Sequence, residues 1–329
     1  MSTCNPVLAI DNLSLEFPAY KSSVKALNGV SLHVNPGEIV GVVGESGSGK
    51  SVTAMLSMRL LPERSYRITS GSLSMLDRDM LNTPEKELLK IRGRDAAMIF
   101  QEPMTALNPT RRIGRQMLDV IIHHQKISTQ QARAKAIELL RDMHIASPEQ
   151  VLDSYPFELS GGMRQRVMIA LAFSCEPQLL IADEPTTALD VTVQRQVLLL
   201  LQEKARQKGT AILLITHDMA LVSQFCDRVY VMYTGAVVEQ GLTADVMRHP
   251  RHPYTQGLLS GLPEMVEPGQ PLMTIPGQVP NLSRLPVGCT FAERCQHALP
   301  ICSERPVLTA INHDEQRKSA CWLPHKELS

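Results

Sequence analysis

The 329-residue sequence has few aromatic side chains and no excess charge of either sign. Phe, Trp and Tyr make up 4% of the residues, and 33 Lys and Arg are balanced by 33 Asp and Glu. A neutral chain lacks the strong basic charge of proteins that hold nucleic acid by neutralising phosphates. Hydrophobic residues still make up 43% of the chain, which is enough apolar material for a sizeable core.

The sequence also lacks a hydrophobic run that could cross a bilayer. Its longest uninterrupted apolar stretches, such as 167–173 and 197–201, fall far short of the roughly 18 residues that a spanning helix needs. The N-terminus has no basic segment, and Asp11 lies where a signal peptide needs its apolar core. We therefore expect a cytosolic chain, in which clustered cysteines act as metal ligands or redox groups and not as disulfides.

The order of predicted elements indicates an α/β fold with a small second domain. Short strands alternate with helices as far as about residue 240, which favours a mostly parallel sheet covered by helices. A helical insert is expected at about 102–175, where the apolar spacing becomes helical. Prolines crowd the chain after Gly241, so we expect a first domain at 1–245 and a second at 246–329.

A phosphate-binding loop follows the buried strand predicted at 38–44. Its sequence, GESGSGKS, matches G-x-x-x-x-G-K-[ST] and precedes a predicted helix. In such a loop, backbone N–H groups face phosphate oxygens, a lysine reaches the outer phosphates, and a hydroxyl holds Mg²⁺. The predicted nucleotide contacts are Gly44, Ser46, Gly47, Ser48, Gly49, Lys50 and Ser51, with Ser51 also a Mg²⁺ ligand.

Two carboxylates end the apolar strand predicted at 179–182. Asp183 is expected to bind Mg²⁺ at the carboxyl end of this strand, where open α/β sheets bind their ligands. Glu184 is then the candidate to polarise the attacking water. An acidic strand end alone is a common surface feature, but together with the phosphate-binding loop it predicts a site that hydrolyses a nucleotide.

The residues at 159–165, LSGGMRQ, resemble the signature of ABC-type ATPases. Other parts of that pattern follow in order: Gln101 resembles the Q-loop, the residues at 188–190 resemble the D-loop with Asp190 at its end, and His217 resembles the switch histidine. The resemblance covers residue 7 to about 240. It implies a RecA-like core, an antiparallel β subdomain and a helical subdomain, which together form an ABC-type P-loop ATPase domain.

The resemblance also implies roles for the matching residues. Gln101 acts at the catalytic site and contacts Mg²⁺, and His217 senses the γ-phosphate. Ser160, Gly161 and Gly162 complete the nucleotide site of a partner subunit in a head-to-tail ATP sandwich, to which Asp190 also contributes. Tyr20 resembles the aromatic residue that stacks on adenine, with Phe17 as a competing candidate.

The last third of the chain resembles one particular branch of the ABC-type ATPases. The run HPRHPYTQGLL at 249–259, followed by IPG at 275–277 and PVGC at 286–289, is similar to the C-terminal region of ATPase subunits in oligopeptide, dipeptide and nickel importers, nearest to those for dipeptides or D,D-dipeptides. This resemblance implies a peripheral subunit at the cytoplasmic face of the bacterial inner membrane that energises peptide import. Its expected partners are two permease subunits, a second and non-identical ATPase subunit, and an extracytoplasmic binding protein, with no nucleic acid.

Four of the seven cysteines lie in this proline-rich segment, as Cys289-x₅-Cys295-x₆-Cys302-x₁₈-Cys321. Four thiolates suit either tetrahedral Zn²⁺ or an iron–sulfur cluster, and these spacings are wider than the usual pairs of zinc ligands. The resemblance to dipeptide ATPases implies a [4Fe–4S] cluster, with Zn²⁺ as the alternative. The remaining cysteines are expected to be plain buried residues.

The main competing hypothesis is a soluble ABC ATPase that acts on nucleic acid or ribosomes. A DNA-repair enzyme of this type needs a long coiled coil between the phosphate-binding loop and the signature, and a translation factor needs two ATPase cassettes. Only 108 residues lie between Ser51 and Ser160, and the chain holds one cassette. Glu184 and His217 are both present, which argues against a scaffold that does not hydrolyse ATP.

Overall fold

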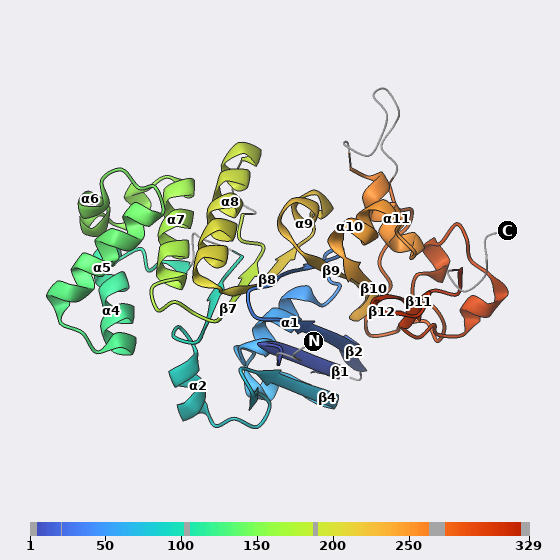
Figure 1. The fold of residues 1–329 in the computed structure, drawn as a ribbon. Helices are drawn as coiled ribbons and strands as arrows, with labels where there is room; N and C mark the ends of the chain where they lie inside the picture. Colours follow the sequence, from blue (N-terminus) through green and yellow to red (C-terminus); the bar gives the residue numbers. More distant parts are fainter. Residues whose placement is uncertain (1–4, 21, 102–105, 187–189, 263–273, 324–329) are drawn as a thin grey trace. The chain divides into compact units, whose positions relative to one another are not determined.

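Segments that are far apart in the sequence combine in each of two units. A computed structural model describes residues 5–20, 22–101, 106–186, 190–262 and 274–323 (Figure 1). The first unit comprises residues 1–7, 34–38 and 82–214, and the second comprises 8–33, 39–81 and 215–329.

Two parallel strands position the acidic strand end in the first unit. Strand β6 (Ala96–Ile99) pairs with β7 (Leu179–Asp183), and Ile99 lies opposite Ala182. All five residues of β7 are buried, as in parallel strands that are covered on both faces. The carboxyl ends of β6 and β7 therefore lie at the same edge and bring the residues that follow them together.

Helices make up most of the rest of the first unit (Figure 1). They are α2 (Glu85–Ile91), α4 (Ile113–Gln125), α5 (Thr129–Asp142), α6 (Pro148–Asp153), the 3₁₀ turn η2 (Pro156–Glu158), α7 (Gly161–Ala172) and α8 (Val191–Lys208). Apolar residues one turn apart, such as Ile113, Met117 and Ile121 of α4, are buried. Helix α5 begins with a capping box between Ser128 and Gln131. The predicted helical insert is thus formed by α4 to α7.

The second unit contains an antiparallel sheet with the strand order β2-β1-β4-β5. Its strands are β1 (Leu8–Ala19), β2 (Ser22–Val34), β4 (Arg67–Met75) and β5 (Arg78–Asp79). The register between β1 and β4 shifts after Asp11, which marks a bulge. Gly71 lies opposite this bulge, where an added Cβ would come within 2.5 Å of the Asn12 carbonyl oxygen.

A second group of strands leads to the phosphate-binding loop. These strands lie in the order β11-β12-β10-β9-β3. Their bounds are β3 (Ile39–Val43), β9 (Arg228–Tyr233), β10 (Ala236–Leu242), β11 (Thr309–Ile311) and β12 (Asp314–Ser319). Strand β3 pairs in parallel with β9. Strand β9 pairs with β10 through a turn at Thr234 and Gly235, whose φ values are 46° and 79°. The 246–329 segment therefore supplies β11 and β12 to this group.

The remaining elements connect these strands. They are α1 (Lys50–Ser57), η1 (Glu63–Ser65), β8 (Ala211–Thr216), α9 (Met219–Phe225), α10 (Thr243–Arg248), α11 (Pro253–Ser260), η4 (Ala292–Arg294) and η5 (Pro300–Ser303). Strand β8 begins in the first unit, and its last two residues belong to the second. Within the described part of the chain, no helix has the length and apolar character that crossing a membrane requires.

Candidate functional site

The predicted phosphate-binding loop runs from the end of β3 into α1, as the sequence pattern requires. Two of its glycines are needed for close backbone approach. A Cβ at Gly44 would lie 2.1 Å from the Met232 carbonyl oxygen, and one at Gly49 would lie 2.7 Å from the Ala26 carbonyl oxygen. Gly49 also caps α1 with a φ of 98°, a left-handed conformation that favours glycine.

Lys50 turns its side chain toward the inside of this loop. Its Nζ donates hydrogen bonds to the carbonyl oxygens of Gly44, at 2.7 Å, and Glu45, at 2.9 Å, and lies 3.4 Å from Ser48 Oγ. The Lys50 ammonium is therefore fully partnered, although the residue is only 5% exposed. A cation held over the concave side of a loop of backbone N–H groups, with Ser51 next on the helix, is suited to bind polyphosphate.

Two residues outside the motif contact the second residue of the loop, and a third contacts one of these two. The Glu45 carboxylate accepts hydrogen bonds from Arg294, and the Glu45 N–H donates one to the hydroxyl of Tyr254. Tyr233 contacts Arg294 in turn. Sequence reasoning missed the contacts to Glu45 because Tyr254 and Arg294 lie 209 and 249 positions away and belong to no local motif.

Gln101 and Glu184 are brought together at the carboxyl ends of β6 and β7. Gln101 Nε2 donates a hydrogen bond of 3.0 Å to Glu184 Oε2. Glu184 has a φ of 44°, a conformation that costs energy for a residue with a side chain, and Asp183 before it is only 4% exposed. The structure thus joins a predicted water-polarising carboxylate to the predicted Q-loop amide.

The predicted signature begins helix α7. Ser160 is its N-cap, and Ser160 Oγ accepts a hydrogen bond of 3.3 Å from Met163 N. Gly162 faces helix α8, where an added Cβ would lie 3.0 Å from Val193 Cγ1. Asp190 is the N-cap of α8 and accepts a hydrogen bond from Val193 N at 3.0 Å. Ala188 and Leu189 of the predicted D-loop lie outside the described residues.

His217 and Tyr20 both belong to the second unit and are both exposed. His217 directly follows β8, and Asp218 caps helix α9 through hydrogen bonds from Ala220 N and Leu221 N. Tyr20 is 89% exposed at the end of β1, while the competing Phe17 is half-buried. Solvent therefore reaches the Tyr20 ring more fully than the Phe17 ring.

The four clustered cysteines line one small pocket in the second unit, together with Phe291, Trp322 and His297. Burial raises the pKa of Cys289 and Cys295, and it raises the pKa of Cys321 to about 11. The neighbouring thiols raise these pKa values further, because each thiolate would repel the next. Among the residues that the structure describes, no group of three or more His, Cys, Asp or Glu side chains is arranged to hold a metal ion.

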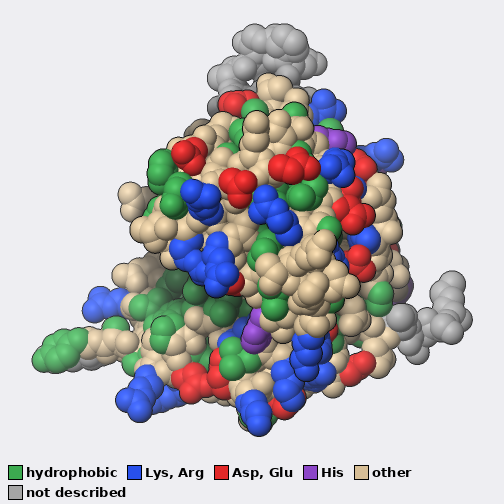
Figure 2. Space-filling view, turned by 90° about the vertical axis from the view of Figure 1, so that its left-hand side faces the viewer, with side chains coloured by type: hydrophobic (Ala, Val, Ile, Leu, Met, Phe, Trp, Pro, Cys, Tyr) green, Lys and Arg blue, Asp and Glu red, His purple; other side chains and the backbone are tan. Residues whose placement is uncertain are grey.

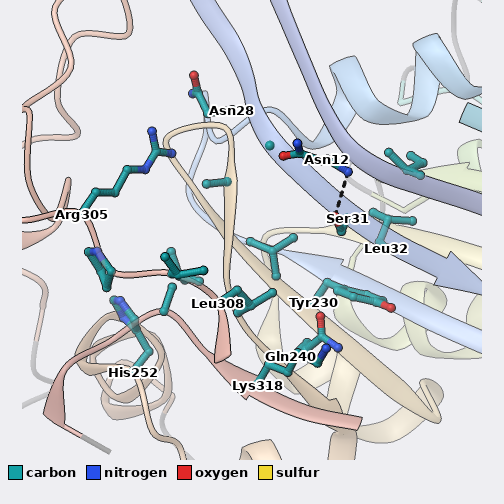
Figure 3. Close-up of a pocket in the computed structure, with 18 of the residues that line it drawn as sticks. Asn12, Asn28, Ser31, Leu32, Tyr230, Gln240, His252, Arg305, Leu308 and Lys318 are labelled. Carbon is teal, nitrogen blue, oxygen red and sulfur yellow. Dashed lines mark hydrogen bonds between the residues drawn. The ribbon is translucent and has the colours of Figure 1, made fainter. Parts of the chain in front are cut away.

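A larger cavity of about 890 Å³ in the second unit shares His252, Cys289 and Phe291 with the cysteine pocket (Figure 3). Strands β1, β2, β9 and β10 line it together with residues 305–308 and β12. Figure 3 shows polar side chains around it, including Arg305, Lys318 and Gln240. The sequence carries no sign of this cavity, because its walls come from segments that are distant in the chain.

Comparisons with known proteins cover both parts of the chain. A family described as "ABC transporter" matches residues 27–187, and one described as "Oligopeptide/dipeptide transporter, C-terminal region" matches residues 238–302. The chain is 64% identical to the probable D,D-dipeptide transport ATP-binding protein DdpD of Escherichia coli, over 98% of each chain. It is 46% identical to the oligopeptide transport ATP-binding protein OppD of Salmonella typhimurium, over 98% of this chain and 96% of the relative.

Solved structures resemble the ATPase part. A dimeric post-hydrolysis structure of the ATP-binding cassette MJ0796 with ADP and Pi matches with a TM-score of 0.64 and 26% identity, over 72% of this chain and 98% of that one. The cbiO1 protein of Clostridium perfringens, part of the ABC transporter complex cbiONQ, matches with a TM-score of 0.63 and 26% identity, over 74% of this chain and 92% of that one.

Proposed function

The chain belongs to the oligopeptide/dipeptide branch of the ABC transporter ATP-binding proteins, and we propose that it powers the import of short peptides by hydrolysing ATP. The observation that carries this proposal is the 64% identity to a D,D-dipeptide transport subunit, which runs through both the ATPase segment and the C-terminal region. Dipeptides are therefore the favoured substrate class.

The residues of the phosphate-binding loop and the strand ends have distinct roles in this proposal. Lys50 binds the outer phosphates, and Ser51 and Asp183 hold Mg²⁺ with Gln101. Glu184 polarises the attacking water, and His217 contacts the γ-phosphate. The hydrogen bond between Gln101 and Glu184 supports a shared catalytic role for these two residues. Tyr20 is the proposed stacking partner of adenine.

The signature residues act on a second ATPase subunit. Ser160, Gly161 and Gly162 lie at the start of helix α7, where N–H groups and the helix dipole attract phosphate. We propose that they complete the partner's nucleotide site and that Asp190 lies in the same interface. The resemblance to a dimeric cassette with ADP and Pi supports this arrangement. The partner subunit is proposed to be related but not identical.

Attachment to the membrane is proposed to come from two permease subunits at the cytoplasmic face. The proposed contact surface is the helical segment at 102–145, of which residues 102–105 lie outside the described part of the chain. An extracytoplasmic binding protein delivers the peptide to the complete transporter. Figure 2 shows Lys and Arg interspersed with Asp and Glu on the face it presents, which does not favour a nucleic-acid partner.

The direct test is transport in proteoliposomes that contain the two permease subunits and both ATPase subunits. We expect ATP hydrolysis to rise when the binding protein carries a dipeptide, with D-Ala-D-Ala compared against L-Ala-L-Ala. The Lys50→Ala complex is the negative control for ATP dependence. Hydrolysis that does not respond to any loaded binding protein would contradict the importer assignment.

We propose further that Cys289, Cys295, Cys302 and Cys321 hold a [4Fe–4S] cluster. The donor set fits, because all four thiols line one pocket. A single Zn²⁺ ion would need sulfurs within about 2.3 Å of its centre, whereas a cluster is held by cysteines that lie further apart. When bound, the cluster would supply a redox-active group, and its iron would keep the four sulfurs deprotonated despite their burial.

Anaerobic purification tests the cluster. We expect a brown protein with broad absorption near ~400 nm, with iron and sulfide in equal amounts. Cys295→Ser should bleach it, and Cys226→Ser is the matched control because Cys226 is a buried free thiol outside the pocket. Stoichiometric zinc without iron would favour the alternative ion.

A further inference from the structure

The C-terminal segment contacts the phosphate-binding loop through Glu45. Arg294 Nη1 donates a hydrogen bond of 2.7 Å to Glu45 Oε2, and Arg294 Nη2 donates one of 3.0 Å to Glu45 Oε1. This bidentate pair is largely buried, since the Arg294 side chain is 5% exposed and the Glu45 side chain 29%. Bidentate charge-assisted pairs fix geometry as well as adding energy.

The Arg294 guanidinium is itself held in place. Its Nε donates to the Pro276 carbonyl oxygen at 2.8 Å, and Nη1 also lies 3.2 Å from the Tyr233 hydroxyl. The guanidinium carbon lies 5.8 Å from the centre of the Tyr233 ring and 5.9 Å from that of Phe291. Because these contacts fix the guanidinium, Arg294 determines the position of the Glu45 carboxylate.

A second contact holds the backbone at the same point. The Glu45 N–H donates a hydrogen bond of 2.7 Å to the hydroxyl of Tyr254, which is fully buried on helix α11. The Tyr254 ring lies 4.6 Å from the Tyr233 ring and 5.4 Å from the Phe291 ring, measured between centroids. The first N–H after Gly44 therefore points toward the C-terminal segment.

Glu45 also connects this anchor to the phosphate-binding lysine. Its carbonyl oxygen accepts a hydrogen bond from Lys50 Nζ. The carboxylate of Glu45, one residue from Gly44, would repel nucleotide phosphates if Arg294 did not neutralise it. Arg294 thus acts on both the position and the charge of the loop.

We propose that Arg294 and Tyr254 are positioning residues that hold the phosphate-binding loop in its nucleotide-binding conformation, so that the C-terminal segment sets the ATP affinity. Arg294 ends the 3₁₀ turn η4 and directly precedes Cys295. The same turn therefore presents one of the four cysteines and the arginine that holds the loop. This link to the cysteine site rests on the cluster proposed above.

The first test measures the dissociation constant of the full chain for a fluorescent ATP analogue. We expect Arg294→Met and Tyr254→Phe each to weaken binding about tenfold, with kcat at saturating ATP retained in the assembled complex. Arg284→Met is the matched control, because Arg284 is an exposed arginine of the same segment. Arg294→Lys should bind ATP more tightly than Arg294→Met but less tightly than the wild type, since lysine does not form a bidentate pair.

A double variant separates the effect of the unpaired Glu45 carboxylate from a loss of folding. Glu45→Gln in the Arg294→Met background should recover part of the lost affinity, because it removes the unpaired carboxylate. Thermal unfolding followed by fluorescence of Trp322, the one tryptophan of the chain, checks that each variant is folded. If Arg294→Met does not fold, Tyr254→Phe decides the question. Wild-type ATP affinity in a folded Tyr254→Phe variant, or a loss confined to kcat, would overturn the proposal.

The link to the cysteines is tested by non-additivity. Cys295→Ser should weaken ATP binding in the wild-type background and have little further effect in the Arg294→Met background. Fully additive losses would overturn the link. Iron is measured in the same preparations, so a wild-type protein without iron would reject the cluster while the Arg294 and Tyr254 variants still decide the role of the anchor.

Discussion

Glu184 directly follows the buried strand β7, and its carboxylate accepts a hydrogen bond from the side-chain amide of Gln101. Glu184→Gln keeps the size of the side chain and removes its ability to polarise water, so we expect ATP binding to persist while kcat falls by about 10²- to 10⁴-fold. Lys50→Ala should weaken nucleotide binding itself. ATP hydrolysis and nucleotide retention by the complex measure both effects. Glu203→Gln, an exposed change on helix α8, serves as control, and substantial turnover in Glu184→Gln would refute the assigned role.

The buried His252 is expected to make the free energy of unfolding depend on pH. The residue is 2% exposed, its Nδ1 accepts a hydrogen bond from Tyr254 N, and burial lowers its pKa from 6.5 to about 4. Between these values the unfolded chain takes up a proton that the folded chain does not. The free energy of unfolding should therefore be at its full value above pH 6.5 and fall as pH decreases, by about 1.4 kcal/mol per pH unit.

Urea unfolding at pH 7 and pH 5, followed by Trp322 fluorescence, checks this dependence. We expect His252→Asn to lose about 2 kcal/mol less than the wild type between these two values, because Asn does not titrate. Other titrating groups contribute equally to both proteins, so their effects cancel in this comparison. One of them is Glu239, whose pKa is raised by burial and whose contribution to the pH dependence of stability has the opposite sign. His313→Asn, at an exposed turn position, is the matched control. Equal losses in His252→Asn and the wild type would rule His252 out as the source.

The two arginines that directly precede helix α4 are expected to contact the permease or to lie beside that contact. Arg111 forms an ion pair with Asp119, and the Arg112 guanidinium lies 5.7 Å from the centre of the Tyr155 ring. We expect charge reversal of both arginines to reduce the fraction of the chain that sediments with membranes containing the permease, while ATP affinity stays within about twofold.

The matched control for this reversal is Arg64→Glu with Arg78→Glu, which changes the net charge equally at exposed positions outside the 102–145 segment. Because Arg111→Glu also loses the Asp119 pair, thermal unfolding of both double variants is compared. Unchanged membrane recruitment in a folded Arg111→Glu, Arg112→Glu variant would place the contact elsewhere.

The elements that the sequence predicted are those with local signals. The apolar run of β7 and the helical spacing of apolar residues in α4 each depend on a few neighbouring residues. The hairpin of β11 and β12 was not predicted, because its turn residues, Asn312 and His313, adopt φ values of 52° and 62° without a glycine. Of its two strands, β12 pairs with β10, and the paired residues lie about 80 positions apart in the sequence.

The candidate site also contains residues that the sequence could predict and contacts that it could not. The Gly44 to Ser51 loop, Asp183 and Glu184 could be predicted because phosphate and Mg²⁺ binding impose residue types at fixed spacing. Nothing near Glu45 indicates that its carboxylate faces Arg294, since this contact depends on the tertiary fold. The large cavity lined by Arg305 and Lys318 was missed for the same reason.

At the scale of the whole molecule, the proposed roles give the chain two half-sites for ATP. Its phosphate-binding loop and its signature are expected to act on different nucleotides, so the isolated chain should hydrolyse ATP slowly. We expect it to remain in the supernatant when expressed alone and to sediment with membranes when expressed with its permease and partner ATPase. Hydrolysis rates before and after assembly, and after addition of loaded binding protein, measure this. An isolated chain with full activity would favour an ATPase that works without a transporter.

The anchoring of Glu45 by Arg294 and Tyr254 also has a consequence for the order of events on the ribosome. Translation at about 5–20 residues per second separates the emergence of the loop from that of Arg294 by some tens of seconds. During this interval the nascent chain displays the complete nucleotide motif without the contacts that hold its second residue. A newly made chain therefore acquires its anchored loop only after residue 294 has emerged, and until then the loop is expected to bind nucleotide more weakly.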